Sequence, residues 1–336
     1  MNWDWRKMGM SNPIEEIGGK ILAAESVLLF PHVNMDGDAL GSCVALCKSL
    51  RMLGKKCNIL IAEEIPMYLR FLDRDYCITN GDKFKNPDLC IAIDCGEVSR
   101  FKSRSDFFFK GQSTMVIDHH LATDPVFDFN YVDSKASATA MLIFRILKHI
   151  NAPLDKEIGE AIWAGITTDT GNFQYSNTTK ETHDIAAELH DLGIDHNAVS
   201  INIYENIRPE KILMTNKVMD NLAFFANGRG AITYATRDIF QETGATLDET
   251  EGIVETLRCI SGVEVSAFLK EDGEDTITVS MRSKTEADVA EIATRFNGGG
   301  HKKAAGCTIN ATMDFAVKMI ISEIEISLKK AGKTKA

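Results

Sequence analysis

Apolar and polar positions alternate along the first part of the chain with two periodicities, one typical of strands and one typical of helices. Short runs of aliphatic and β-branched residues are bounded by polar breaks, which is the pattern of buried strands. Between them lie longer stretches in which apolar residues recur every three or four positions, as on one face of a helix. This alternation predicts an α/β unit, a parallel sheet with helices on both faces. The predicted strands are residues 26–31, 57–62, 89–93 and 115–117, and the predicted helices are residues 14–24 and 39–53.

The pattern changes in the second half of the chain. From Ala136 to about Glu205 it is mainly helical, with the clearest helices at residues 155–168 and 179–192. From Ala223 onward strands and helices return in another order, which predicts a smaller C-terminal α/β unit that begins with a hairpin about Asn227-Gly228-Arg229-Gly230. Its further elements are helices at residues 248–259, 287–296 and 314–330, strands at residues 263–269 and 276–281, and a glycine turn.

These changes of pattern predict two domains, residues 1–195 and residues 216–336, joined by a helical linker of residues 196–215. Pro209 is expected to open the connecting helix, because proline is well tolerated in the first helical turn. No apolar stretch approaches the roughly 18 to 20 residues of a membrane span. The start MNWDWRKMGMSNP lacks the apolar core of a secretory signal. We therefore expect a cytoplasmic protein with no membrane partner.

Composition narrows the chemistry further. The chain of 336 residues has 44% hydrophobic residues and a formal net charge of -11. That charge argues against a protein that coats nucleic acid by nonspecific phosphate attraction, so a polyanionic substrate must be met by local cations or bound metal ions. The eight cysteines form no CxxC pair and lie mostly within apolar runs. They are predicted to be reduced core thiols and not a disulfide framework or a zinc knuckle.

Polar clusters stand where apolar runs end. Because open α/β sheets bind ligands at the carboxyl ends of their strands, we expect these clusters to converge. Imidazoles mixed with carboxylates, without thiolates, are typical of a site for Mn, Mg or Fe, with Zn also open. About seven candidate ligands exceed what one ion uses, which predicts two metal ions. The cluster residues are His32, Asp36, Asp38, Asp94, Asp118, His119, His120 and Asp169.

The first two clusters also have simpler interpretations. Asp36 and Asp38 could be plain turn and N-cap residues. Alternatively both face the site, with Gly37 permitting a tight turn between them and the N-terminus of the following helix attracting a phosphate oxygen. Asp94 could cap a helix that starts near Glu97, or it could bridge two ions.

Packing alone explains the adjacent histidines poorly. His119 and His120 directly follow a buried strand, where imidazoles are costly unless they are paired or bound. We expect one of them to bind metal and the other to face the substrate. Asp169 ends a predicted helix, where the helix dipole disfavours a carboxylate. A bound cation would compensate for that dipole, and a solvated loop residue is the alternative.

A second candidate site lies in the C-terminal unit. Asn297-Gly298-Gly299-Gly300-His301 can form a nest of backbone N–H groups that receives an anion, and the imidazole adds a donor. Arg282 ends a predicted strand and could place its guanidinium fork on a phosphate. A flexible turn and a surface arginine are the alternative.

Together these segments resemble a known family. HVNMDGDALGS, AIDCG, VIDHH, GITTDTG and NGGGHKKAAG are similar to the motifs of DHH phosphoesterases of the DHH plus DHHA1 type, in the NrnA-like group of oligoribonucleases and pAp phosphatases. The resemblance extends from about residue 14 to residue 325. It implies an N-terminal DHH catalytic domain that binds metal and a C-terminal DHHA1 domain that binds substrate.

The resemblance also implies a role for each motif residue. One metal ion would be held by His32, Asp36 and Asp94, and the other by Asp38, Asp94, His119 and Asp169. The catalytic residues would be Asp94, His119 and His120, with His120 against the scissile phosphate. The far end of the substrate would be held by Arg282, Gly298, Gly299, Gly300 and His301. The family favours Mn2+, with Mg2+, Co2+ or Zn2+ as further choices.

The implied activity is two-metal hydrolysis of short oligoribonucleotides to mononucleotides and of pAp to AMP. The implied partners are short single-stranded RNA and small nucleotides, and long duplexes are excluded. Three alternatives stay open: a phosphodiesterase for cyclic di-AMP or linear dinucleotides, a family II pyrophosphatase or polyphosphatase, and a nucleotide-binding regulator with an inactive site. A homodimer is also left open.

Overall fold

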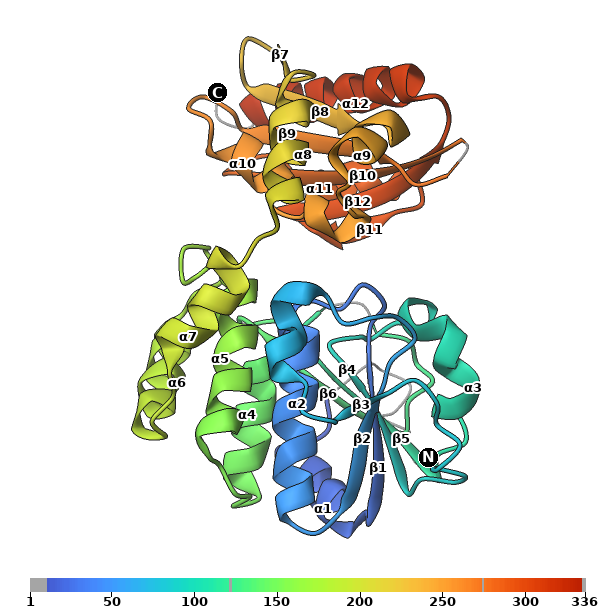
Figure 1. Ribbon diagram of the computed structural model, residues 1–336, viewed down its shortest axis with the longest axis vertical. Coiled ribbons are helices and arrows are strands. Elements are labelled where there is room, and N and C mark those ends of the chain that lie inside the picture. The colour runs from blue at the N-terminus through green and yellow to red at the C-terminus, as the bar shows by residue number, and fades with distance from the viewer. Residues whose placement is uncertain (1–10, 121–122, 274, 334–336) are drawn as a thin grey trace. The chain divides into compact units, whose positions relative to one another are not determined.

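The computed structural model describes residues 11–120, 123–273 and 275–333, and the chain divides between Asn206 and Ile207 into two compact units (Figure 1). The division lies inside the segment predicted as a linker. That segment is largely helical. It contains α7 (His196–Ser200) and the short π-helical turn η4 (Ile201–Glu205) in the first unit, and the start of α8 (Pro209–Met219) in the second. Pro209 is the first residue of α8, as predicted.

The first unit is built on a six-stranded parallel sheet in the order β3-β2-β1-β4-β5-β6. All four predicted strands are present: those at residues 26–31 and 89–93 have the predicted bounds, and the ends of the other two differ by one or two residues. β3 and β6 were not predicted, because β3 has only two residues and β6 buries only Asn130. The strands are β1 (Ser26–Pro31), β2 (Lys56–Leu60), β3 (Cys77–Ile78), β4 (Leu89–Ile93), β5 (Ser113–Asp118) and β6 (Phe129–Val132).

Helices cover both faces of this sheet, as predicted. One face packs in a large aliphatic core against α1, α2, α4 and α5. The other face is covered by η3 and α3, where the rings of Phe30, Phe101 and Phe108 lie with centroids between 5.0 and 6.1 Å apart. The helices are α1 (Ile14–Ala23), α2 (Gly37–Met52), η2 (Met67–Leu72), η3 (Val98–Arg104), α3 (Ser105–Phe108), α4 (Thr139–His149), α5 (Lys156–Asp169) and α6 (Lys180–Asp191).

Glycines allow α2 and α5 to pack closely. A Cβ atom on Gly41 would lie 2.3 Å from the carbonyl oxygen of Ala161, and one on Gly37 would lie 2.5 Å from Thr168 Cγ2. The predicted role of Gly37 in a tight turn is therefore wrong. It is the first residue of α2, and it must lack a side chain because α5 is so near. This contact brings the start of α2 to the end of α5, where Asp169 lies.

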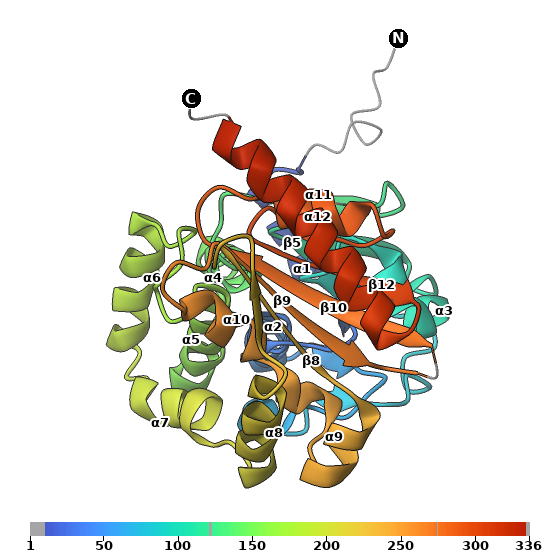
Figure 2. The ribbon, with the colours of Figure 1, turned by 90° about the horizontal axis from the view of Figure 1, so that it is seen from above.

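The second unit contains a mixed six-stranded sheet in the order β11-β12-β10-β9-β8-β7, in which only β8 and β9 are parallel. α11 and α12 pack against the apolar face of this sheet, and α12 lies across it (Figure 2). On the opposite face, β8 and β9 pack against α8 and α10. The elements after α8 are β7 (Ala223–Phe225), β8 (Gly230–Ala235), α9 (Arg237–Thr243), η5 (Leu247–Thr250), α10 (Ile253–Cys259), β9 (Val265–Glu271), β10 (Thr276–Ser283), α11 (Val289–Thr294), β11 (Gly299–His301), β12 (Ala304–Asn310) and α12 (Met313–Lys333).

Two predicted features of this unit need correction. The predicted helix at residues 248–259 is divided into η5 and α10 by Gly252, whose φ is 91°. The predicted glycine turn is partly a strand, because Gly299–His301 pair with β12. The N–H of Gly298 donates to the carbonyl oxygen of Ala293 at 2.9 Å. These backbone groups therefore do not form the predicted anion-binding nest.

The cysteines are free thiols, and six of the eight are buried, which agrees with a packing role. Cys77 is partly buried and Cys259 is exposed. Within the described residues, no helix has the length and apolar character needed to cross a bilayer.

Candidate metal centre

The polar clusters of the first unit meet at the carboxyl end of its sheet. His32 directly follows β1, Asp94 follows β4, and Asp118 ends β5, and these three strands are neighbours. Parallel strands place their carboxyl ends at one edge, so the predicted convergence is observed. Three overlapping groups have ligand atoms within 4.8 Å of one another: His32 with Asp36 and Asp94, Asp38 with His119 and Asp169, and Asp94 with His119 and His120.

Asp94 lies between the first two groups. Its Oδ2 is 3.5 Å from His32 Nε2, and its Oδ1 is 3.6 Å from His119 Nε2. The backbone is held in the left-handed region at φ 57°, and Thr139 Oγ1 donates to Oδ1 at 2.7 Å. Burial opposes charge on Asp94, but the neighbouring imidazoles of His120 and His32 hold its pKa well below the ordinary value. The residue is a fixed carboxylate with one oxygen toward each group.

Backbone carbonyls fix the orientation of two histidine rings. His32 Nδ1 lies 2.7 Å from the carbonyl oxygen of Val33, and His119 Nδ1 lies 3.2 Å from that of Ala136. These contacts make Nδ1 the donor and turn Nε2 toward the carboxylates. His32 Nε2 is buried and has no hydrogen-bond partner among the described residues. His119 Nε2 is 3.1 Å from Asp169 Oδ2. A divalent cation fits this arrangement, because it would occupy the space between the imidazole nitrogens and the carboxylate oxygens.

Asp36 and Asp38 cap helices and also contribute to the groups. Asp36 Oδ1 accepts from the N–H of Asp38 at 3.1 Å and from that of Ala39 at 3.0 Å, so two donors at the start of α2 are already used. The predicted phosphate contact at this helix N-terminus is therefore not supported. The buried Asp38 accepts from the N–H groups of Thr139 and Ala140 at 2.6 and 2.8 Å, which caps α4.

Negative charge is concentrated at this edge of the sheet. Burial and the nearby carboxylates of Asp94 and Asp169 raise the pKa of Asp38 well above its ordinary value. Burial disfavours charge on His32 and His119, but their carboxylate neighbours prevail and raise both pKa values to about 10. Divalent cations would relieve the repulsion and displace these protons.

Metal uptake should therefore release protons. With pKa values of about 10, His32 and His119 are both protonated near pH 7 in the metal-free protein, and a metal ion binds only the neutral ring. Adding Mn2+ at pH 7 should release about two protons per chain from these rings, measured with a pH indicator in weak buffer. His32→Asn should lower the release by about one proton. No release from the parent protein would contradict ligation by the histidines.

His120 is oriented differently from His119. Its Nδ1 lies 2.7 Å from Asp118 Oδ1, which also accepts from the backbone N–H of His120 at 2.9 Å. Asp118 is fully buried, whereas the His120 side chain is 28% exposed. Burial disfavours the charged ring, but hydrogen bonds with Asp118 and Asp94 raise the His120 pKa to about 11. A cationic, partly exposed ring beside the candidate metal ligands suits contact with a phosphate.

On the second unit, Arg282 and His301 share one face of the sheet. Arg282 on β10 is the register partner of Ala304 on β12, and His301 on β11 pairs with the same alanine. Directly opposed residues point to one face, and adjacent strands lie about 4.8 Å apart, so the two side chains flank Ala304. This face is opposite the one that buries Met281 under α12. The next row on the same face is Ser280, Gly306 and Gly299.

The three glycines before His301 differ in their surroundings. A Cβ atom on Gly298 would lie 2.2 Å from the carbonyl oxygen of Gly306, and one on Gly300 would lie 2.5 Å from that of Ala304. Both positions exclude a side chain because it would clash with the backbone of β12, whether or not a ligand is bound. A Cβ atom on Gly299 would meet nothing within 4 Å, and its φ is not positive. Gly299 therefore borders open space.

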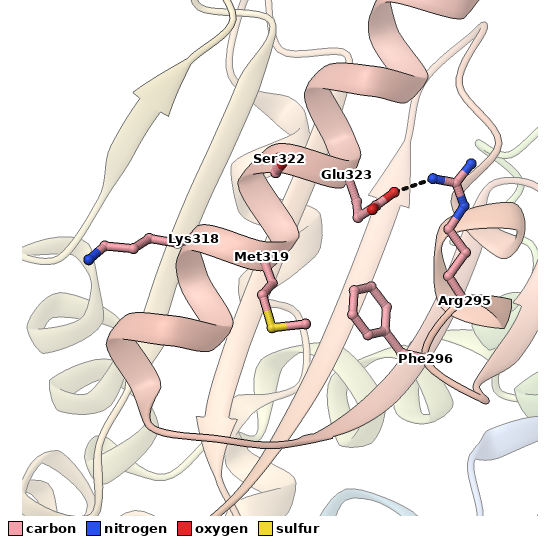
Figure 3. A pocket seen from close by; sticks show the side chains of 6 residues that line it. All are labelled: Arg295, Phe296, Lys318, Met319, Ser322 and Glu323. Atoms are coloured by element: carbon pink, nitrogen blue, oxygen red, sulfur yellow. Dashed lines mark hydrogen bonds and ion pairs between the residues drawn. The ribbon is translucent and has the colours of Figure 1, made fainter.

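A separate hollow of about 380 Å³ lies between α12 and the end of α11 (Figure 3). Arg295 donates to Glu323 and, at 3.2 Å, to Glu291, so its charge is balanced within the chain. The hollow is on the α12 side of the sheet, opposite Arg282, and is not part of the predicted substrate surface. Its lining residues are Arg295, Phe296, Lys318, Met319, Ser322 and Glu323.

Some residues around the metal centre had no role in the sequence analysis. Arg104 is buried and donates to the carbonyl oxygens of Leu60 at 2.6 Å and Pro31 at 2.8 Å, which ties the ends of β1 and β2 together just before His32. Neither Arg104 nor Thr139 lies in a distinctive motif, so local patterns could not identify them. Asp118 was predicted as part of the polar cluster with the two histidines that it precedes, but it lies outside the three ligand groups and instead binds the ring of His120.

The fold and the site define a class: two α/β units, of which the first gathers histidines and carboxylates suited to divalent metal ions. Family models agree with this division. The N-terminal domain of the DHH family matches residues 26–166, and the DHHA1 domain matches residues 228–325. The chain belongs to the DHH/DHHA1 family of metal-dependent phosphoesterases.

Relatives align over nearly the whole chain. The bifunctional oligoribonuclease and PAP phosphatase NrnA of Thermus thermophilus is 30% identical, over 98% of this chain and 96% of the relative. The protein of the same name from Bacillus subtilis is 29% identical, over 85% and 90%. The crystal structure of an exopolyphosphatase-related protein from Bacteroides fragilis is 26% identical, with a TM-score of 0.86 over 93% of this chain and 95% of that one.

Two more distant matches are described by the substrate or the metal ion that they bind. The cyclic-di-AMP phosphodiesterase PdeA of Listeria monocytogenes is 23% identical over 94% of this chain, which spans 49% of that relative. RecJ of Thermus thermophilus, solved in complex with Mn2+, is 14% identical with a TM-score of 0.52, over 93% of this chain and 54% of RecJ. The likeness to RecJ shows the fold alone.

Proposed function

We propose that this phosphoesterase hydrolyses short oligoribonucleotides to mononucleotides and pAp to AMP. The observation that carries the proposal is the position of Asp94, whose two oxygens lie toward separate groups of histidine and carboxylate ligands. A carboxylate in this position could be shared by two metal ions, as two-metal hydrolysis of phosphate esters would use it. Both proposed activities appear in the names of relatives aligned over most of the chain.

The ligand groups support a specific assignment of two ions. His32, Asp36 and Asp94 would hold one, and Asp38, Asp94, His119 and Asp169 would hold the other. Oxygen and imidazole ligands suit Mn2+, the ion in the RecJ complex. Bound divalent ions supply a nucleophilic water near neutral pH and neutralise charge on the phosphoryl oxygens.

The residues of the chain contribute the remaining chemistry. The cationic ring of His120 would donate to a phosphoryl oxygen and stabilise the charge that develops there. Asp118 would hold that ring through Nδ1 during the reaction. Asp38 is fixed by its bonds to the start of α4, and Asp94 by Thr139, so neither carboxylate needs to reorganise.

The second unit would hold the far part of the substrate. Arg282 and His301 flank the small side chain of Ala304, an arrangement that can receive a phosphate from two sides. The open space beside Gly299 would receive the adjoining sugar or base.

Gly299 offers a direct test of this surface. Valine suits an edge strand, and a Cβ atom at position 299 meets nothing within 4 Å, so Gly299→Val should fold normally. It should raise KM for a diribonucleotide roughly tenfold by filling the ligand space, with kcat nearly unchanged. Gly19→Val is the matched control, because Gly19 also has open space at Cβ and lies in α1. Equal KM values for the two variants would contradict a ligand at Gly299.

A phosphodiesterase for cyclic di-AMP is the second candidate. The same metal ligands would serve that reaction, and the match to PdeA over most of this chain favours it. An inactive nucleotide-binding regulator is less consistent with the site, since binding alone does not require two complete ligand groups.

A substrate panel separates these functions. Initial rates of the Mn2+-loaded protein would be compared on RNAs of increasing length from the dinucleotide, on pAp and on cyclic di-AMP. We expect fast hydrolysis of the shortest RNAs and of pAp, with rates that fall as RNA length increases. Fastest hydrolysis of cyclic di-AMP would establish the second candidate instead. No hydrolysis of any of these compounds would overturn the proposed function.

A further inference from the structure

The guanidinium group of Arg282 is held at two of its corners. Nε donates to Glu255 Oε1 at 2.8 Å, and Nη1 donates to the carbonyl oxygen of Met281 at 3.0 Å. Within the described part of the chain, Nη2 has no further partner. The side chain is therefore fixed at the end nearest the sheet and keeps donors for a ligand at the other end.

The helix that carries Glu255 is bound to the strand beside Arg282. Glu255 lies on α10, next to Val254, whose carbonyl oxygen accepts from Ser266 Oγ at 2.8 Å. Ser266 on β9 is the direct register partner of Arg282. The sheet thus fixes the segment of α10 that carries Glu255, and Glu255 fixes the arginine.

Stability alone explains Glu255 poorly. Its Oε2 is buried and has no hydrogen-bond partner among the described residues, and an unsatisfied buried carboxylate oxygen destabilises a fold. Its negative charge also weakens anion attraction at Arg282. Orientation is what the carboxylate adds, because a long arginine side chain otherwise samples many rotamers.

We propose that Glu255 is a positioning residue that holds Arg282 in the orientation that binds a phosphate group of the nucleotide substrate. The inference rests on the proposed function, since it assumes a nucleotide at the Arg282 face. Removing Glu255 should weaken substrate binding through Arg282 and leave the chemical step at the metal centre nearly intact.

A double-mutant cycle tests this coupling, with KM and kcat measured on a diribonucleotide. Glu255→Ala should raise KM roughly tenfold with little change in kcat, and Arg282→Ala should raise it at least as much. The double variant should match Arg282→Ala alone. Glu255→Gln keeps an acceptor for Nε and should restore KM to within about threefold of the parent. Thr256→Ala, at an exposed position of α10, controls for disturbance of the helix.

The outcomes separate the possible roles. If Glu255→Ala raises KM equally in the presence and absence of Arg282, Glu255 contacts the substrate itself or supports the fold, and the proposal is wrong. Failure of Glu255→Gln to restore KM would also overturn it. Calorimetric binding of pAp to the same four proteins repeats the cycle without turnover. Absent hydrolysis by the parent would then overturn the proposed function while the coupling was still measured.

Discussion

Asp94→Asn should reduce kcat roughly 10³-fold or more, because the charge that faces both ligand groups is lost. Asparagine is the appropriate replacement, since it tolerates the left-handed backbone at φ 57° that would strain alanine. The amide can still accept from Thr139 Oγ1, so the fold should be preserved. Rate, metal content and thermal unfolding would be measured on one preparation, and metal content should fall together with the rate.

Asp75→Asn is the matched control for this change. Asp75 is exposed, lies outside the site and also has a left-handed backbone, with φ 60°. Its substitution should change neither rate nor metal content. Parental activity in Asp94→Asn would show that the two ligand groups do not share this carboxylate.

Asp118→Asn should lower kcat by roughly 10²-fold with metal content unchanged, because His120 loses the carboxylate that fixes and charges its ring. Asp118 helps to raise the His120 pKa, so its loss should lower that pKa. In the proposed mechanism the protonated ring is the active form. As the pH rises, the variant should therefore lose activity at a lower pH than the parent does. Bound cations lower the pKa in both proteins, so the difference between the two profiles reports Asp118.

Asp128→Asn provides a control for the fold around β5. Asp128 accepts from the N–H and Oγ1 of Thr114 at the opposite end of that strand, so its substitution should affect stability only. If Asp118→Asn keeps the parental kcat and pH profile, Asp118 is a packing residue and His120 needs no orienting carboxylate.

Much of the metal centre could be predicted because each part has a local signal. His32, Asp94 and the His119-His120 pair each follow an apolar run, and parallel topology brings the ends of such runs together. They meet in overlapping groups that share Asp94, each with ligand atoms within 4.8 Å of one another, which confirms the predicted convergence. The ions themselves stay a prediction.

The remaining features depend on contacts between distant segments. The need for glycine at position 37 comes from Thr168 on another helix, and Thr139 reaches Asp94 from 45 residues away. The glycine segment before His301 was predicted to form a nest, because a strand of only three residues has no recognisable alternation of apolar and polar residues. Glu255 could not be found either, since only the register of β9 and β10 brings α10 beside Arg282.

Metal content and rate measured on the same samples test the central claim most directly. Metal-free protein would be reloaded with increasing amounts of Mn2+, desalted, and analysed by inductively coupled plasma mass spectrometry while its rate on a diribonucleotide is recorded. We predict a rate that stays low up to about one ion per chain and rises as the content approaches two. Full activity at one ion per chain, or without any ion, would contradict the two-metal account.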